Sequence, residues 1–437
     1  MRRIRPIETI LIASGMVLSV DCSGHSGSSS VTSSGEAGAG TTNSDHTLAV
    51  SSWWASPGET DALQSLMDSY AKTYADANVA NLAIAGGGNA RSWLAQEIHA
   101  GSPPDVFQQN GYRMAPFLTA LPNSVQPVDD IFNDPSLRDS VIETAVQSVT
   151  INGHIVGVPI AIHRENSVFY NYAILTSYNV TAPTSLSQLL DACTKLKKVG
   201  IKTPLAMGGQ NWIINEVFVD VLQATMGATA FRDFMTGTTP ITDSGLQGNL
   251  SSAIDTFQQV MACADQSVIA NTKVTWTDAA NQLMNGSAAI LMHGDWVKGY
   301  LQQMGWTPNV DFTMSAAPGT SDIFWYDVDV LALASQAAHP QSGHDFLVMA
   351  VSLPAQVAFS ALKGSIPIRK DARPLVDTLT QSAIDDISSA AVTMAVVADG
   401  WGTAAQTFAT DGNKASFLAA INAAPPNPDA PVDPEDN

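Results

Sequence analysis

From residue 46 onward the chain alternates short apolar runs with segments of helical periodicity. The apolar run 46–54 predicts a strand, and the spacing of apolar residues over 59–75 predicts an amphipathic helix. Residues 81–101 then predict a strand, a glycine turn and a second helix, and residues 103–110 predict a further strand. Strands that alternate with helices of this length predict an α/β fold whose sheets are largely parallel.

Aromatic and amide side chains stand at the carboxyl ends of these predicted strands. In open parallel sheets, ligands bind beyond the carboxyl ends of the strands. The order of the elements alone therefore predicts a ligand-binding edge. The residues at this edge are Trp53, Trp54, Gln108, Gln109 and Asn110.

The rest of the chain continues the pattern with a long β-rich stretch at 152–175. We expect helices at 185–199, 212–226 and 250–264, and extended segments at 288–300 and 324–333. At 437 residues the chain is long enough for two lobes. Because the sequence shows no internal repeat and no second low-complexity linker, these lobes must be joined by several crossings.

The composition is typical of a soluble globular protein, with 45% apolar and only 14% charged residues. The formal net charge is −20. A surface this acidic repels phosphate backbones, so nucleic acid is not an expected partner. Long-range attraction of an anionic ligand is not expected either, whereas a neutral ligand is easily accommodated.

The first 21 residues predict a secretory signal peptide. Basic residues precede an uncharged apolar run at 10–20, which is too short to span a bilayer as a mature helix. The sequence LSVDC ends at Cys22 and resembles a lipobox, whose cysteine is acylated after cleavage, although Asp21 replaces the preferred small residue. A plain signal peptide cleaved nearby is the alternative. We therefore expect the protein in the periplasm or on the outer face of the cytoplasmic membrane, with a lipid anchor as its only membrane contact.

Low-complexity sequence follows the signal peptide and also ends the chain. Residues 22–45 are rich in Ser and Gly and predict a flexible tether, and residues 426–437 are rich in Pro and Asp and predict a disordered tail. Neither segment can build a core.

Two further cysteines, Cys193 and Cys263, lie within the predicted folded region. In an oxidising compartment they can form one disulfide or remain buried thiols, and their spacing does not decide between the two. The eight histidines are scattered, and neither a CxxC nor an HxxEH motif is present. We therefore expect no metal site and no cofactor.

Seven sequence blocks run in one order between about residue 47 and residue 420. They are SWW, GGGNAR, PPDVFQ, VPIAIHREN, LAMGGQNW, HGDW and LKGSIPIR. Together they resemble the family-1 extracellular solute-binding proteins of bacterial ABC importers, and within that family the periplasmic glucose/mannose-binding proteins. The resemblance implies two α/β lobes joined by three crossings, with the ligand in the cleft between them. Binding would close the lobes by a hinge motion, and the permease subunits of the importer would bind the closed form.

The resemblance also implies where the lobes divide and what they hold. The N-terminal lobe would comprise 46–159 plus 328–364, and the C-terminal lobe 160–327 plus 365–425. The implied ligand is a sugar, a monosaccharide such as glucose or an epimer. The implied protein is a monomer and not an enzyme.

A sugar site needs flat aromatic faces for the C–H faces of the ring and fixed donors and acceptors for its hydroxyls. The tryptophans that match the family's blocks are Trp53, Trp54, Trp212, Trp276 and Trp296. Each of them could instead be a core residue, and of the adjacent pair we expect only one in the cleft.

The polar candidates for the same site are Glu59, Gln108, Asn110, His163, Asp295, Asp329 and Lys363, with Asn166 as a further amide. Carboxylates accept paired hydrogen bonds from neighbouring hydroxyls. Asp329 is the most informative, because a carboxylate inside an apolar strand needs a partner, and its neighbour Asp327 is expected to be solvated. Structural roles stay open for Glu59 as a charge on the helix dipole, for His163 as an interior histidine and for Lys363 as a surface residue.

One position departs from the family's pattern. The glucose binders carry a histidine in the segment that here reads AAVTMAVVAD, where Thr393 takes its place. Sites that hydrogen-bond a particular hydroxyl discriminate strongly between analogues. The substitution therefore leaves the identity of the sugar open.

Two other functions fit parts of the sequence. A glycoside hydrolase would use two facing carboxylates, but the sequence marks no such pair among its candidates, Glu59, Glu165, Asp295 and Asp329. The same fold could instead bind a peptide, a polyamine or an amino acid, or present a sugar to a signalling receptor. Polyamines would suit the acidic charge, whereas tryptophans and amides suit a sugar.

Overall fold

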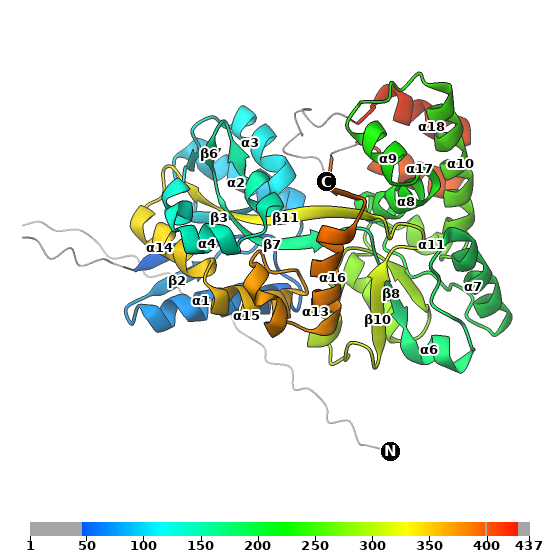
Figure 1. Cartoon of the computed structure of the whole chain (residues 1–437), viewed down its shortest axis with the longest axis horizontal. Helices are drawn as coiled ribbons and strands as arrows, with labels where there is room; N and C mark the ends of the chain where they lie inside the picture. The colour runs from blue at the N-terminus through cyan, green and yellow to red at the C-terminus, as the bar shows by residue number, and fades with distance from the viewer. Residues whose placement is uncertain (1–45, 398–399, 427–437) are drawn as a thin grey trace, which may run out of the picture. The chain divides into compact units, whose positions relative to one another are not determined.

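The structure, a computed structural model, describes residues 46–397 and 400–426 (Figure 1). The predictions that lie outside the described residues are the signal peptide at 1–21, lipidation of Cys22, the tether at 22–45 and the tail from residue 427. Pro426, the first residue of the predicted tail, is described and is buried.

The main sheet combines strands from distant parts of the chain. Its order is β12–β11–β3–β1–β2, and β4 and β7 also pair with β11. Its strands are β1 (Thr47–Ser51), β2 (Asn78–Asn81), β3 (Val106–Asn110), β4 (Val125–Gln126), β7 (Val158–Arg164), β11 (Ile323–Ala334) and β12 (Val392–Ala395). β1 runs parallel to β2 and β3, whereas β11 runs antiparallel to β3, β4 and β7. The predicted α/β class is confirmed, but the expectation of largely parallel sheets is wrong, because the long strand β11 runs antiparallel to β3, β4 and β7 and parallel only to β12.

Two strands carry the chain between two hydrophobic cores. Ile162 of β7 packs in the first core, and Val168, in β8 (Ser167–Asn171), packs in the second. Along β11, Ile323 packs in the second core and Val328 in the first. β7 and β11 are paired, and Figure 1 shows them side by side. The expected lobe boundaries at residues 160 and 328 fall inside these two strands.

A third connection starts where α15 (Leu353–Lys363) ends. Ile366 and Ile368 still pack in the first core. Ile366 also exchanges backbone hydrogen bonds of 2.9 Å in both directions with Ile162 of β7. This pairing keeps the chain in the first core past residue 364, where the sequence placed the boundary.

A three-stranded sheet of order β10–β8–β9 contributes residues both to the second core and to a smaller core. The main helices beside this sheet are α7 (Leu186–Lys198), α8 (Asn211–Met226) and α10 (Ser244–Met261), which pack in the second core, and α12 (Trp276–Met284), which packs in the smaller one. The first three correspond to the helices expected at 185–199, 212–226 and 250–264. α10 begins earlier than expected because Asp243 caps it by accepting a hydrogen bond from the backbone N–H of Leu246, at 2.8 Å.

The segment expected to be extended over 288–300 is a strand only in part. β9 covers Ile290–Met292, and the chain then turns and enters α13 (Val297–Gln303). Asp295 fixes this turn, because its carboxylate accepts from the backbone N–H of Arg164 at 2.9 Å and its own N–H donates to Arg164 O at 3.0 Å. The prediction was wrong because a short apolar run does not distinguish a buried strand from a buried helix.

A disulfide joins Cys193 of α7 to Cys263, just after α10, with Cα atoms 5.9 Å apart. The two cysteines are 70 residues apart in sequence. In the chain-entropy account, a cross-link of this span stabilises the fold by roughly 4 kcal/mol. The bond therefore ties together two helices of the second core.

The remaining elements are β5 (Thr150–Ile151), β6 (His154–Ile155), β10 (Phe312–Ala316), α1 (Glu59–Thr73), α2 (Gly87–Ala100), α3 (Met114–Ala120), α4 (Pro135–Ser140), α5 (Glu143–Gln147), α6 (Tyr172–Ser177), α9 (Ala228–Met235), α11 (Gln266–Ile269), α14 (Pro340–Ala350), α16 (Thr378–Ser389), α17 (Gly402–Asp411) and α18 (Lys414–Ala423), with 3-10 turns at Gly111–Arg113, Asp129–Asn133 and Lys370–Leu375. Among the described helices, none has by itself the length and apolar composition to cross a membrane. α14 and α15 meet those criteria only as a pair, and the pair is bent by 79°.

Candidate functional site

A cavity of about 920 Å³ lies between elements of the two cores. Elements of the first core contribute the loop after β1, the start of α2 and the ends of β3 and α15. Elements of the second core contribute one face of α8 and the start of α12, and β7 and β11 line the cavity where they pass between the cores. The volume is near the upper end of the usual range for small-ligand sites.

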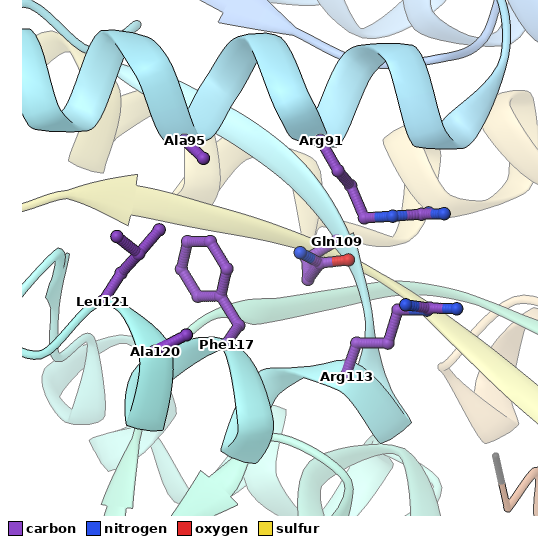
Figure 2. Close-up of a pocket in the computed structure, with 7 residues that line it drawn as sticks. All are labelled: Arg91, Ala95, Gln109, Arg113, Phe117, Ala120 and Leu121. Carbon is purple, nitrogen blue, oxygen red and sulfur yellow. The ribbon is translucent and has the colours of Figure 1, made fainter. Parts of the chain in front are cut away.

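A second pocket, of about 30 Å³, is lined by Arg91, Ala95, Gln109, Arg113, Phe117, Ala120 and Leu121 (Figure 2). Figure 2 shows the side chains of Arg91 and Arg113 extending to the same side of Gln109. Both arginines also line the large cavity. Burial and the neighbouring charge of Arg113 lower the pKa of Arg91 to about 10. The small pocket has room only for water, so the large cavity is the candidate binding site.

Five charged side chains form a continuous series of ionic contacts, which we call the buried charge chain. Its members, in order, are Glu59, Lys363, Asp329, His163 and Asp295, and all five are buried. Lys363 Nζ lies 3.4 Å from Glu59 Oε1 and 3.7 Å from Asp329 Oδ2. His163 Nε2 lies 2.9 Å from Asp329 Oδ2, and His163 Nδ1 lies 2.5 Å from Asp295 Oδ1.

The charge states follow from this pairing. Burial and nearby Lys363 lower the pKa of His163, but Asp295 and Asp329 outweigh them and raise it to about 9. Both ring nitrogens of His163 therefore donate near neutral pH. Burial raises the pKa of Asp329, but Lys363 and His163 outweigh burial and hold that pKa below its ordinary value. For Glu59, burial dominates over Lys363, and its pKa is raised.

Local structure explains how these side chains converge. Glu59 is the first residue of α1, and Lys363 is the last residue of α15. Gly364, with φ +84°, ends α15 in a left-handed conformation. A Cβ on Gly364 would lie 2.3 Å from the backbone nitrogen of Gly299 in α13, so only glycine permits this contact. The close approach brings Lys363 next to the turn that carries Asp295.

Tryptophan faces make up much of the remaining wall. Trp53, Trp212, Trp276 and Trp296 line the cavity, whereas Trp54 is fully buried and packs against Phe359. Only one of the adjacent pair therefore faces the cavity. The rings of Trp212 and Trp296 are 6.3 Å apart between centroids. A further tryptophan that lines the cavity, Trp325, was not predicted from the sequence; it stands in β11 two residues before Asp327.

Some predicted polar residues lie behind the wall and position others. Gln108 donates from Nε2 to Asp329 Oδ1 at 2.9 Å, and its Oε1 accepts from the backbone N–H of Trp53 at 3.1 Å. Neither Gln108 nor Asp295 lines the cavity. Asn110, His163, Glu59, Asp329 and Lys363 do line it.

The expectation that Asp327 is solvated is wrong. Asp327 is only 6% exposed, and it lines the cavity beside Asp329. Burial and the neighbouring charge of Asp329 raise the pKa of Asp327 to about 7, and Asn110 donates to its carboxylate. Alternate residues of a strand share a face, so the spacing of these two aspartates could have predicted the result.

Two residues singled out from the sequence do not line the cavity. Asn166 is fully buried, and its side chain bonds Gln223, Thr320 and the backbone of β11. Thr393 donates from Oγ1 to Ile387 O at 2.9 Å.

Most of the contribution of α8 to the cavity wall was not predicted from the sequence. Besides Trp212, this helix lines the cavity with Asn211, Asn215, Glu216, Val219 and Asp220. The spacing of these residues was visible, but charged residues at helical spacing usually mark a solvated face. In the described part of the chain, no group of three or more histidine, cysteine, aspartate or glutamate side chains is arranged to hold a metal ion.

Comparison with known proteins gives three consistent results. The model of bacterial extracellular solute-binding proteins matches residues 56–357. An uncharacterised ABC transporter extracellular-binding protein of Pyrococcus horikoshii is 31% identical over 389 residues, covering 87% of this chain and 84% of the relative. A probable sugar-binding periplasmic protein of Rhizobium meliloti is 26% identical, covering 77% and 80% of the two chains.

Solved structures show the same fold. A bacterial solute receptor with an exclusive preference for β-D-galactopyranose superposes with a TM-score of 0.72 at 18% identity, covering 86% of this chain and 96% of that receptor. This likeness confirms the predicted two-lobe α/β fold with its cleft between the lobes.

Proposed function

The chain belongs to the bacterial extracellular solute-binding protein family, and from this premise we propose that it captures a sugar outside the cytoplasm and delivers it to the permease subunits of an ABC importer. The observation that carries the proposal is that tryptophan faces and four members of the buried charge chain line one cavity. The names of the Rhizobium meliloti relative and of the galactopyranose receptor support the same class of ligand.

The chemistry of the cavity suits a pyranose. The C–H faces of the ring pack on tryptophan faces, and its hydroxyls need donors and acceptors that do not move. Asp329 and Glu59 offer acceptor oxygens, and Lys363 offers donors, at positions fixed by their contacts with one another. Because these groups are already held in place, little conformational entropy is lost when a sugar binds.

The proposal also covers the size of the ligand, the closure of the lobes, the oligomeric state and the membrane anchor. The ligand is a monosaccharide, glucose or an epimer. One lobe comprises 46–159 plus 328–368 and the other comprises 160–327 plus 369–425. The two lobes close on the ligand by a hinge motion. The protein acts as a monomer without catalytic activity. Cys22 anchors it by a lipid to the outer face of the cytoplasmic membrane, which metabolic fatty-acid labelling of the wild type and of Cys22→Ala would test.

A thermal-shift screen tests the class of ligand. A ligand that binds only the folded state raises the melting temperature, and the rise grows with ligand concentration. The purified protein is screened against monosaccharides, disaccharides, amino acids and polyamines at millimolar concentration. We expect saccharides alone to raise the melting temperature, with monosaccharides giving the larger rise.

The outcomes separate the class from the size of the ligand. If an amino acid or a polyamine raises the melting temperature and no saccharide does, the proposed function is wrong. If disaccharides stabilise more than any monosaccharide, the sugar class stands and the monosaccharide proposal fails.

A further inference from the structure

One face of α8 runs along the cavity. Trp212, Glu216 and Asp220 are spaced by four residues, so they lie in a row on that face. At a rise of 1.5 Å per residue the row is about 12 Å long. It presents an aromatic face followed by two carboxyl groups.

Asp220 has no partner that accounts for its burial. It is 3% exposed, yet it lines the cavity. Among the described residues, no hydrogen bond reaches its carboxylate and no basic nitrogen lies within 4.0 Å. The positive charge that acts on it is that of Arg164, whose guanidinium is already held by Asp386 and by Ile323 O.

Two more carboxyl groups lie next to Asp220. Glu216 bonds the ring of His293, and its side chain is also within hydrogen-bonding reach of Glu165. A bond between two carboxyl groups requires a proton on one of them. We call Glu165, Glu216 and Asp220 the acidic subsite, and all three line the cavity.

All three carboxyl groups of the acidic subsite have raised pKa values, and burial is the largest cause for each of them. Burial, followed by the charges of Glu216, Asp327, Asp295 and Asp329, raises the pKa of Glu165 well above its ordinary value. Burial and the charge of Glu216 raise the pKa of Asp220 in the same way, against Arg164. Burial also raises the pKa of Glu216 against His293. Arg91, Arg113 and Lys363, the arginines and lysine of the lining, come from elements of the first core.

We propose that the acidic subsite, together with the face of Trp212, binds an ammonium group carried by the sugar, so that the preferred cargo is an amino sugar. An ammonium has three donors and no acceptor, which matches three carboxyl groups. A tryptophan face adds cation–π attraction. A neutral hydroxyl would leave the carboxylates without a counter-charge, and burial of an unpaired carboxylate is unfavourable. The inference rests on the proposed function, because the sugar ring still needs the tryptophans and the buried charge chain.

Isothermal titration calorimetry of the full chain tests the inference with matched ligands. The ligands are glucosamine and galactosamine, the parent sugars glucose and galactose, and the two N-acetylated derivatives, which lack the charge. We expect at least one amino sugar to bind tenfold or more tightly than its parent, and acetylation to abolish the gain. Binding should also release protons, seen as a heat that varies with the ionisation enthalpy of the buffer.

Variants assign the effect to the acidic subsite. Asp220→Asn should reduce the ratio of amino-sugar to parent-sugar affinity to about one, and Glu165→Gln, a second variant in case the first does not fold, should act in the same direction. Asp191→Asn removes the same charge from the exposed surface of α7 and should leave the ratio unchanged.

The outcomes also distinguish this inference from the proposed function. Parent sugars that bind as tightly as their amino forms overturn the inference and leave sugar capture standing. A ratio preserved in both acidic-subsite variants overturns it as well. Binding of spermidine without binding of any saccharide overturns both.

Discussion

The buried charge chain and the acidic subsite both contain buried carboxyl groups, but these groups differ in how far they are paired with basic side chains. In the buried charge chain, Asp329 contacts Lys363 and His163, and Asp295 contacts His163. In the acidic subsite, Asp220 has no ionic partner within 4.0 Å among the described residues, and Glu216 has only the ring of His293. The comparison teaches that burial by itself does not make a carboxylate structural. The position of a cation decides whether the carboxylate stabilises the fold or is left for a ligand.

The largest effect is expected when the same substitution, aspartate to asparagine, is made in each of the two regions. Asp329→Asn leaves two buried cations with one carboxylate fewer, and breaking a buried ion pair from one side lowers stability by about 3–5 kcal/mol. Asp220→Asn removes only a charge that burial disfavours, so the free energy of unfolding should stay the same or rise. Urea unfolding of both variants without ligand measures the difference. Equal losses of unfolding free energy in the two variants would show that the carboxylates of the two regions do not differ in their pairing with cations.

The second prediction concerns pH. The pKa of Asp327 rises from 3.8 to about 7, so its contribution to stability is complete below 3.8 and is lost as pH rises through 7. The pKa of His163 rises from 6.5 to about 9, so its contribution is complete below 6.5 and is lost as pH rises through 9. The raised pKa values of Glu59, Glu165, Glu216 and Asp220 act in the same direction as that of Asp327.

We therefore expect the free energy of unfolding to fall by several kcal/mol between about pH 4 and pH 9, because each pKa shift of one unit corresponds to about 1.4 kcal/mol. Asp329, whose pKa is lowered, opposes this trend only below its ordinary pKa of 3.8. Urea unfolding across this range measures the slope, and Asp327→Asn should flatten its lower half. A free energy of unfolding that rises from pH 4 to pH 7 would contradict these charge states.

The same two regions show what the sequence could and could not predict. Trp53, His163 and Lys363 were predictable because conspicuous residue types stand near strand and helix ends, and Asp329 because it is a carboxylate inside an apolar strand. A resemblance in block order supports all four. The contacts that hold them were not predictable, because most of these contacts join distant positions, such as His163 with Asp295 and His163 with Asp329. Exposure depends on such contacts, which is why the sequence alone could not place Asp295 behind the cavity wall.

The acidic subsite was missed for a different reason. Glu216 and Asp220 carried a visible signal, since they follow Trp212 at intervals of four residues. A charged stripe on a helix usually faces solvent, but in this fold the stripe on α8 lines the cavity, opposite residues of the first core. The likeness to known solute-binding proteins gives the fold, but it does not say which helix face is acidic.

The third prediction compares two tryptophans. Trp276 lines the cavity, whereas Trp306 is similarly half-buried but stacks on Phe312 away from it. Trp276→Ala should weaken sugar binding tenfold or more, about 1.4 kcal/mol, because the ring loses a packing face. Trp306→Ala should leave the affinity within twofold. Calorimetry with the tightest-binding sugar measures both, and an unchanged affinity in Trp276→Ala would remove that tryptophan from the site.

The smallest effect is expected at Thr393, which lies outside both regions. Its hydroxyl donates to Ile387 O at 2.9 Å and does not line the cavity, although Val396 and Val397 of the same segment do. Thr393→Val should lower the free energy of unfolding by about 1 kcal/mol through the lost hydrogen bond. It should change the affinities for glucose, mannose and galactose by less than twofold, because no contact to the ligand is removed. Calorimetry with the three epimers measures this directly, and a tenfold change in their relative affinities would show that Thr393 helps to select the sugar and that specificity is not confined to the two charged regions.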